Sequence, residues 1–142
     1  MEQPEILFVD DCEEVLELAA FALKDAGFDV MTAVSGDVAL ILLEQRVPFR
    51  LLITDVVMPG FLDGFALARK AREHLPEIRV IYTTGYREIA SVRSRGAPFG
   101  DVLAKPWSPA ALVELVGASL TGKQLEMAGE TAQISTIVRR PT

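Results

Sequence analysis

Short apolar segments alternate with amphipathic stretches along most of this chain. The apolar segments predict buried strands, because they are too short for ordinary helices and are bounded by turn residues. They lie at residues 6–9, 28–33, 51–53, 79–83 and 102–104. After each of them, apolar residues recur at the spacing of one helix face. These helical patterns cover residues 13–26, 35–45, 64–73, 88–95 and a last stretch that starts at Ser108.

The spacing also predicts which side of a helix faces the core. Ser35 and Ser108 precede two of the helices as capping hydroxyls, and a proline follows Ser108 in the first turn. The expected inward residues of the first helix are Val15, Leu18, Ala19, Ala22 and Leu23. Those of the helix after Ser35 are Val38, Ile41 and Leu42, and those of the last helix are Leu112, Leu115 and Val116.

Strands that alternate with amphipathic helices indicate a parallel sheet with helices on both faces. The pattern contains five such strand–helix units. We therefore expect the flavodoxin-like (βα)5 arrangement, a doubly wound parallel α/β sheet with strand order 2-1-3-4-5. Ligands of such folds bind beyond the carboxyl ends of the first and third strands, where the winding direction changes.

One domain accounts for most of the chain, which has 142 residues. We place this domain at residues 1–120. Residues 121–142 contain two glycines and a proline with only weak periodicity, and we expect them to form a mobile C-terminal tail.

The composition is that of a soluble globular protein, with 50% hydrophobic and 24% charged residues. A net charge of −6 without a basic run argues against direct binding of nucleic acid. No apolar stretch is long enough to cross a membrane, and the polar N-terminus does not resemble a signal peptide. Cys12 is the only cysteine, which excludes an internal disulfide. These features favour a cytoplasmic protein.

Acidic residues follow the two strands that flank the expected ligand site. Asp10 and Asp11 come after the first strand, and Asp55 comes after the third. Carboxylates that converge in this way repel one another unless a cation or a proton lies between them. A small set of carboxylate oxygens open to water suits Mg²⁺ together with an incoming phosphate.

The other two strands near this edge also end in polar residues. Thr83 closes the fourth strand and Lys105 follows the fifth. Together the four strand ends can hold a phosphoryl group: a carboxylate attacks, a metal neutralises phosphate oxygens, an ammonium pairs with another oxygen and a hydroxyl donates to a third. Each residue alone is a common turn or cap residue, so only the joint arrangement carries this prediction.

These residues, with Met58-Pro59, Asp63-Gly64 and Lys105-Pro106, closely resemble the receiver domain of two-component response regulators, including receivers associated with hybrid sensor kinases. The resemblance covers about residues 5–120. It implies that Asp55 is the phosphoacceptor, and that Asp11, Asp55 and the backbone carbonyl of Val57 bind Mg²⁺ directly. Asp10 would act on the metal largely through water.

The same resemblance implies that Thr83 is a switch hydroxyl, that Lys105 pairs with the phosphate, and that the bond before Pro106 is cis. The phosphoryl donor would be a sensor histidine kinase or a histidine phosphotransfer protein. A downstream protein would contact the face formed by the fourth helix, the fifth strand and the fifth helix. The chain departs from the family at Val102, where many receivers have an aromatic residue that turns inward when the switch hydroxyl moves.

Two other readings of function remain. A phosphohydrolase of the haloacid dehalogenase type requires a second acid two residues after its nucleophile, but Cys12 and Val57 occupy those positions after Asp10 and Asp55. We therefore expect a signalling domain and not an enzyme. A receiver-like module that no longer accepts phosphate is disfavoured by the intact set of strand-end residues.

We also expect Cys12 and Trp107 to be packing residues, with Trp107 near the cleft, and His74 to lie on the surface. The sequence does not choose between a stand-alone regulator, a piece of a longer protein and a phosphate sink.

Overall fold

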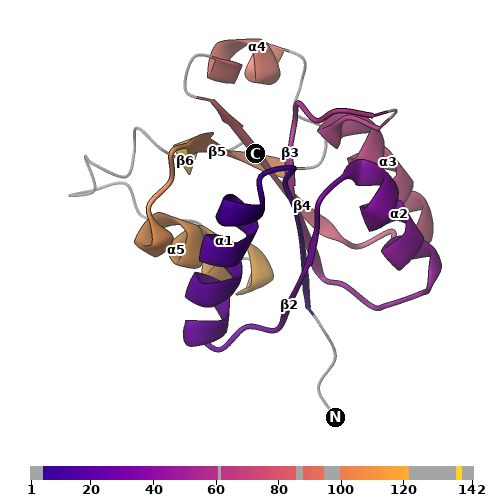
Figure 1. Ribbon diagram of the computed structural model, residues 1–142, viewed down its shortest axis with the longest axis horizontal. Coiled ribbons are helices and arrows are strands. Elements are labelled where there is room, and N and C mark those ends of the chain that lie inside the picture. The colour runs from indigo at the N-terminus through magenta and orange to yellow at the C-terminus, as the bar shows by residue number, and fades with distance from the viewer. Residues whose placement is uncertain (1–4, 61, 86–87, 95–99, 122–136, 139–142) are drawn as a thin grey trace.

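The computed structural model describes residues 5–60, 62–85, 88–94, 100–121 and 137–138. Strands and helices alternate through most of it (Figure 1). The strands are β1 Ile6–Val9, β2 Val30–Ala33, β3 Leu51–Asp55, β4 Arg79–Gly85, β5 Gly100–Lys105 and β6 Ile137–Val138. The helices are α1 Glu13–Asp25, α2 Gly36–Glu44, α3 Gly64–His74, α4 Ile89–Ser94 and α5 Pro109–Thr121.

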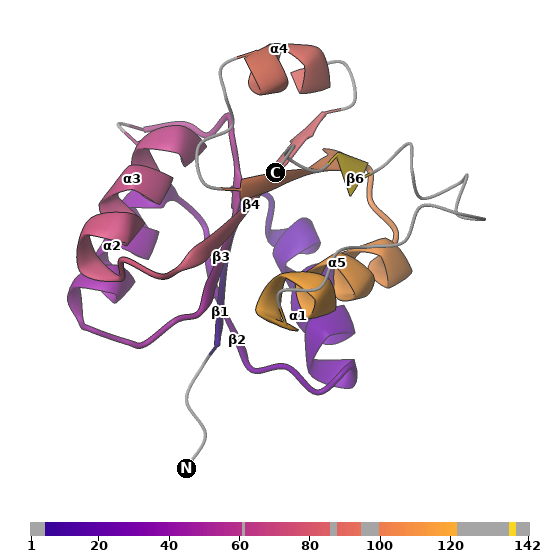
Figure 2. The ribbon, with the colours of Figure 1, turned by 180° about the vertical axis from the view of Figure 1, so that it is seen from behind.

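The strands form one sheet in the order β2-β1-β3-β4-β5-β6. The first five are parallel, which confirms the predicted order 2-1-3-4-5. Helices α1 and α5 cover one face of the sheet, and α2 and α3 cover the other (Figures 1 and 2). The chain therefore reverses its winding between β1 and β3, and the ends of these two strands are the expected ligand site.

Each face of the sheet packs its own hydrophobic core. On the α1/α5 face, Phe8, Ile53, Ile81 and Leu103 are fully buried and belong to one cluster with apolar residues of both helices. On the opposite face, Tyr82 packs against Phe65 of α3, with ring centroids 5.1 Å apart. Burial of this kind contributes roughly 1.5–3 kcal/mol for each large apolar side chain, so the two cores fix the positions of the strand ends.

Helix boundaries agree with the sequence pattern to within one residue, whereas β3 and β4 extend two residues beyond their predicted ends and β2 and β5 begin at other residues than predicted. β2 begins at Val30 and not at Phe28, because the Phe28 N–H donates to the carbonyl of Leu23 and closes the end of α1. β5 begins earlier than predicted, at Gly100. A Cβ at Gly100 would overlap the Val80 carbonyl, so a glycine permits the close approach of β5 to β4.

The predicted inner face of α2 is wrong. Val38 and Ile41 are exposed, while Gly36, Ala39 and Leu43 are buried and Leu42 is only partly buried. The Ser35 hydroxyl does cap the helix by accepting from the Val38 N–H at 3.1 Å. The helix then turns its small residues inward, because a Cβ at Gly36 would already overlap Leu62.

The other two predicted faces agree better with the structure. Leu112, Leu115 and Val116 of α5 are fully buried, as expected. In α1, Ala19, Ala22 and Leu23 are buried and Val15 is partly buried, but Leu18 is 46% exposed and Leu16 takes a place in the core. Within the described residues, no helix has both the length and the apolar character needed to cross a membrane.

The sixth strand is a feature that the sequence pattern did not predict. β6 pairs antiparallel with β5, with Val138 opposite Val102 and Ile137 opposite Leu103. Two residues of the expected tail therefore extend the sheet at its edge. The expectation of mobility concerns mainly residues 122–136 and 139–142, which lie outside the described residues.

Candidate functional site

Four polar side chains continue the α1/α5 face of the sheet beyond its apolar core. Each lies two residues after a buried core residue of its strand, and side chains two apart on a strand point to the same face. The four pairs are Phe8 and Asp10, Ile53 and Asp55, Ile81 and Thr83, and Leu103 and Lys105. The register places Asp55 directly opposite Thr83. The sheet therefore brings the predicted strand-end residues to one place.

Three carboxylates converge there. Oxygen atoms of Asp10, Asp11 and Asp55 lie within 4.8 Å of one another. Asp10 is fully buried, Asp55 is nearly so, and Asp11 is exposed. One Asp10 oxygen accepts from the Cys12 N–H at 2.9 Å, which fixes the carboxylate at the start of α1. The cluster thus has a buried base and an open side, a shape that suits a hydrated hard cation.

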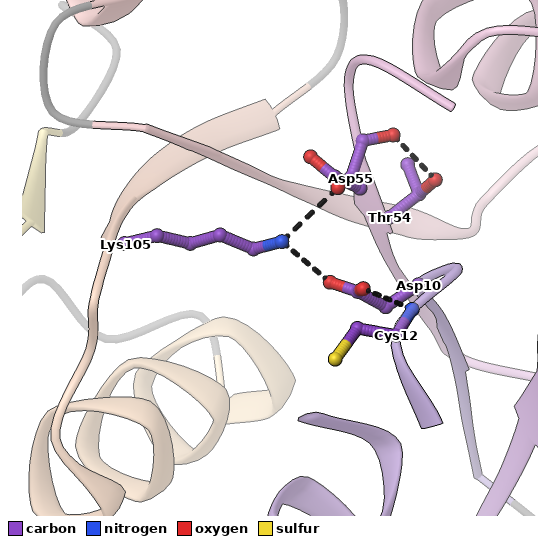
Figure 3. A network of polar contacts seen from close by, with 5 residues as sticks. All are labelled: Asp10, Cys12, Thr54, Asp55 and Lys105. Atoms are coloured by element: carbon purple, nitrogen blue, oxygen red, sulfur yellow. Dashed lines mark hydrogen bonds and ion pairs between the residues drawn. The ribbon is translucent and has the colours of Figure 1, made fainter. Parts of the chain in front are cut away.

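Lys105 bridges two of these acids (Figure 3). Its Nζ lies 2.7 Å from Asp10 Oδ2 and donates to Asp55 Oδ2 at 3.0 Å. The ammonium lies at the buried end of the cluster and offsets part of its negative charge. Since a lysine ammonium donates three hydrogen bonds, a third remains for another acceptor in addition to these two carboxylates.

Burial and neighbouring charges together shift the pKa values of Asp55 and Lys105. Burial raises the pKa of the Asp55 carboxyl, and the nearby Asp10 and Asp11 add to this, although Lys105 lowers the pKa in part. Burial alone would lower the pKa of Lys105, but its hydrogen bonds and ion pairs with Asp10 and Asp55 outweigh that effect and the pKa is raised. The lysine therefore stays charged at neutral pH, while Asp55 is destabilised as a carboxylate.

The loop after β3 is held against the site by backbone contacts. The Val56 N–H donates to the Thr83 carbonyl at 3.0 Å, and the Gly64 N–H donates to the Val56 carbonyl at 2.9 Å. A Cβ at Gly64 would overlap the Asp55 carbonyl, so only glycine fits where the loop returns to begin α3. Asp63 caps α3 by accepting from the Ala66 N–H at 2.8 Å, and the sequence around Asp63-Gly64 gives no sign of the close contact at Gly64.

Thr83 supplies a buried hydroxyl. Its side chain is fully buried, and Oγ1 has no hydrogen-bond partner in the part of the chain that the structure describes. A buried polar atom without a partner is costly, so such atoms deserve a functional explanation. An oxygen-rich ligand above Asp55 would satisfy this hydroxyl, and the carboxylates and Lys105 offer the charges that a phosphate with a divalent cation requires.

Comparison with known proteins agrees with this chemistry. Residues 6–117 match the family model described as the response regulator receiver domain. The chain belongs to the response regulator receiver family. The response regulator receiver protein CpdR of Brucella abortus is 36% identical over 103 residues, which cover 72% of this chain and 84% of CpdR.

Solved receiver structures have the same fold. A response regulator receiver protein from Sinorhizobium medicae superposes with a TM-score of 0.77 and 31% identity, covering 87% of this chain and 98% of that one. The receiver domain of the hybrid histidine kinase CckA superposes with a TM-score of 0.70 and 36% identity, over 82% of this chain and 98% of the CckA domain. Accepting a phosphoryl group in two-component signalling is the general function of this family, and its members interact with histidine kinases or phosphotransfer proteins.

Four further residues singled out in the sequence lie around this site or on the surface. The Lys105–Pro106 bond is cis, the isomer expected from the resemblance. Val57 lies in the loop after Asp55 with its side chain 70% exposed, and the role of its carbonyl stays a prediction. Cys12 is exposed, so its prediction as a packing residue is wrong; it lies immediately before α1, at the rim of the carboxylates. His74 is exposed, as expected.

Trp107 packs beside the site. It is buried and meets Phe8 edge to face, with ring centroids 6.1 Å apart. Trp107 also lines a shallow, mainly apolar cavity of about 300 Å³ with Lys105, Pro106, Val15 and Leu18. The indole is therefore placed to report changes around Lys105.

Proposed function

We propose that Asp55 is the residue of this receiver domain that accepts the phosphoryl group, with Mg²⁺ bound by the neighbouring carboxylates. The observation that carries this assignment is the arrangement around Asp55. An ammonium is hydrogen-bonded to its carboxylate, two further acids lie within 4.8 Å, and the buried Thr83 hydroxyl, which has no hydrogen-bond partner among the described residues, is in register with it. Each of these groups has a partner among the oxygens of a phosphoryl group and the cation that accompanies it.

Asp55 is suited to act as the nucleophile. In the transfer, an Asp55 oxygen forms a bond to phosphorus, and the bond between phosphorus and the donor's imidazole nitrogen breaks with its electron pair left on nitrogen. The carboxylate that burial destabilises becomes an acyl phosphate. Its oxygens extend beyond the strand end into the space between Thr83 and Lys105.

The surrounding residues position this group. Lys105 pairs with one phosphate oxygen while it keeps its ion pair with Asp10, and the Thr83 hydroxyl donates to another oxygen. Asp10, Asp11, Asp55 and the Val57 carbonyl would hold the Mg²⁺, with Asp10 acting largely through water. A cation held there would neutralise part of the negative charge of the carboxylates and of the phosphoryl group.

In the cell, the domain would receive its phosphoryl group from one protein and signal to another. The donor is a sensor histidine kinase or a histidine phosphotransfer protein, and the domain is a cytoplasmic switch without catalytic turnover of its own. A downstream protein contacts the face made by α4, β5 and α5. That face now includes β6, because Ile137 and Val138 pair with β5.

A direct experiment tests the nucleophile. The protein is incubated with a small acyl phosphate donor and Mg²⁺, and its intact mass is measured with and without hydroxylamine. We expect one added phosphoryl group that hydroxylamine and base remove, as expected of an acyl phosphate, and no addition to Asp55→Ala. Equal modification of Asp55→Ala would show that another residue accepts the group.

A further inference from the structure

The acidic side chain of Glu88, the residue before α4, lies against the end of β4. Gly85 is the last residue of β4 and pairs with Lys105 of β5. A Cβ built on Gly85 would overlap Oε1 of Glu88 and lie 3.5 Å from its Cδ. The carboxylate of Glu88 therefore fills the space that a side chain at position 85 would otherwise take.

This space lies on the phosphoacceptor face of the sheet. Ile81, Thr83 and Gly85 alternate along β4, so a side chain at position 85 would point to the same face as the Thr83 hydroxyl. Lys105, the partner of Gly85 in the register, directs its ammonium to Asp10 and Asp55 on that face. The Glu88 carboxylate thus places a negative charge beside Gly85, two residue pairs beyond Thr83 and its partner Leu103.

From this placement we infer that Glu88 senses the charge of the phosphoryl group on Asp55 and transmits it to α4. The inference rests on the proposed function, because it requires Asp55 to be the residue that changes charge. A phosphoryl group carries about −1.5 to −2 charges at neutral pH, while the carboxylate that it modifies carries one. Phosphorylation therefore increases the repulsion on the Glu88 carboxylate, even though Lys105 offsets part of it.

The repulsion acts where α4 begins. Glu88 immediately precedes α4, and Val92 of α4 is 3% exposed and packs in the core that also contains Tyr82 and Val102. When the carboxylate moves away from Gly85, the first turn of α4 moves with it, while Val92 holds the helix to the sheet. Residue 102 is a valine and has no ring that could turn inward. The charge effect at Glu88 would therefore act in place of an aromatic switch.

Two variants test the inference by different routes. Glu88→Gln removes the charge and keeps the shape of the side chain. Gly85→Ala keeps the charge but places a methyl group where Glu88 Oε1 lies, which displaces the carboxylate from the site. Glu77→Gln is the control, because Glu77 is exposed and precedes the opposite end of β4. Glu88→Asp keeps a negative charge in a shorter side chain.

The measurement is the affinity for beryllofluoride at saturating Mg²⁺, at low and high ionic strength. At low salt we expect Glu88→Gln and Gly85→Ala to bind this phosphoryl mimic about threefold more tightly or better, the order of one unscreened surface charge pair. Glu77→Gln should match the wild type, and Glu88→Asp should lie between the wild type and Glu88→Gln. The difference should shrink at high salt, because salt screens exposed charges but does not alter a purely structural role.

Amide hydrogen exchange supplies the second readout. In the wild type, the mimic should change protection at residues 89–92, and in Glu88→Gln this change should be smaller while the mimic is still bound. Equal affinities of wild type and Glu88→Gln at low salt, or a difference that salt does not reduce, would overturn the inference. Binding of the mimic by all these variants leaves the proposed function intact, whereas no binding in any of them would overturn both proposals.

Discussion

Asp55 is held between opposing electrostatic influences. Burial and two neighbouring acids disfavour its ionised form, while the ammonium of Lys105 at 3.0 Å favours it. The net pKa is raised, so the ionised carboxylate costs free energy in the folded protein in the absence of a cation. Binding of a metal ion to Asp55, or modification of its carboxylate, would therefore lower this free-energy cost.

The first prediction concerns the stability of Asp55→Asn. Replacing a desolvated carboxylate by a neutral amide of the same shape should stabilise the folded protein by about 1 kcal/mol at pH 7.5 without Mg²⁺, or about 2–4 °C in melting temperature. Because the pKa is raised, the cost of ionisation grows as pH rises from the unfolded-state value of 3.8 through the folded-state pKa.

The gain should therefore be smaller at pH 4.5 than at pH 7.5, and Mg²⁺ should reduce it by stabilising the wild type more than the variant. Thermal melts at both pH values, with and without the ion, measure this. A variant that is less stable than the wild type at pH 7.5 without Mg²⁺ would contradict the electrostatic description of Asp55.

The second prediction concerns the metal. Titration with Mg²⁺ should change the fluorescence of Trp107, which lines a cavity with Lys105. In Asp11→Ala the affinity should fall by about tenfold or more, as expected when a carboxylate is lost from a cation site. Glu14→Ala makes the same charge change on an exposed residue of the first turn of α1 and should leave the affinity nearly unchanged. Equal losses in the two variants would indicate a general charge effect and no specific site.

Residues at strand ends were predictable from the sequence because the parallel sheet fixes where they meet. The positions of Asp10, Asp55, Thr83 and Lys105 follow from the two-residue period of the strands. Close contacts at glycines, which have no side chain, were not predictable. Neither the approach of Gly64 to the Asp55 carbonyl nor that of Glu88 to Gly85 has a signal in the local pattern.

At the scale of elements, helix faces were predicted less well than helix positions. In α2 almost every residue is apolar, so the spacing did not distinguish the buried Ala39 and Leu43 from the exposed Val38 and Ile41. Close packing at Gly36 decides the phase of the helix. In α5 apolar residues are as frequent, yet the predicted inner residues Leu112, Leu115 and Val116 are buried.

β6 alters what we expect of the C-terminal segment. It adds an antiparallel pairing of two residues at Val102 and Leu103. Such a short strand contributes few hydrogen bonds, each with a net contribution of about 1 kcal/mol. This length also explains why the sequence did not predict it, since two apolar residues form no recognisable pattern.

The third prediction is that truncation after Thr121 has a local effect. The melting temperature should fall by no more than a few degrees, at about 2–4 °C for each kcal/mol lost. Amide exchange in β5 should become faster at residues 102 and 103, where the edge loses its partner. Truncation after Val138 keeps β6 and serves as the control. Unfolding of the chain cut after Thr121, with the control intact, would show that β6 is essential to the fold.

Across the whole molecule, the order of the strands determines how far Asp55, the proposed phosphoacceptor, lies from the surfaces that could report its state. Lys105 ends β5 and forms an ion pair with Asp55, and α4 follows β4 along the chain. The order itself was predictable, because alternating strands and helices leave few arrangements of a doubly wound sheet. The surface that a downstream protein would contact is expected from the resemblance to receiver domains and stays a prediction.

The fourth prediction concerns the spread of the conformational change. Beryllofluoride with Mg²⁺ should shift the population of two arrangements of the loops around Asp55. Changes in amide exchange should concentrate in residues 83–105 and in the loop after Asp55, with the N-terminal strand and α1 nearly unchanged. Changes confined to α1 would place the output surface elsewhere.

Locating the modified residue is the decisive test of the role of Asp55. The protein is phosphorylated by a small acyl phosphate with Mg²⁺, the acyl phosphate is reduced with borohydride to an alcohol, and the changed residue is located by peptide mass analysis. We expect one reduced residue, Asp55, and none when Mg²⁺ is chelated before the donor is added. Reduction at Asp10 or Asp11 with Asp55 unchanged would contradict this expectation.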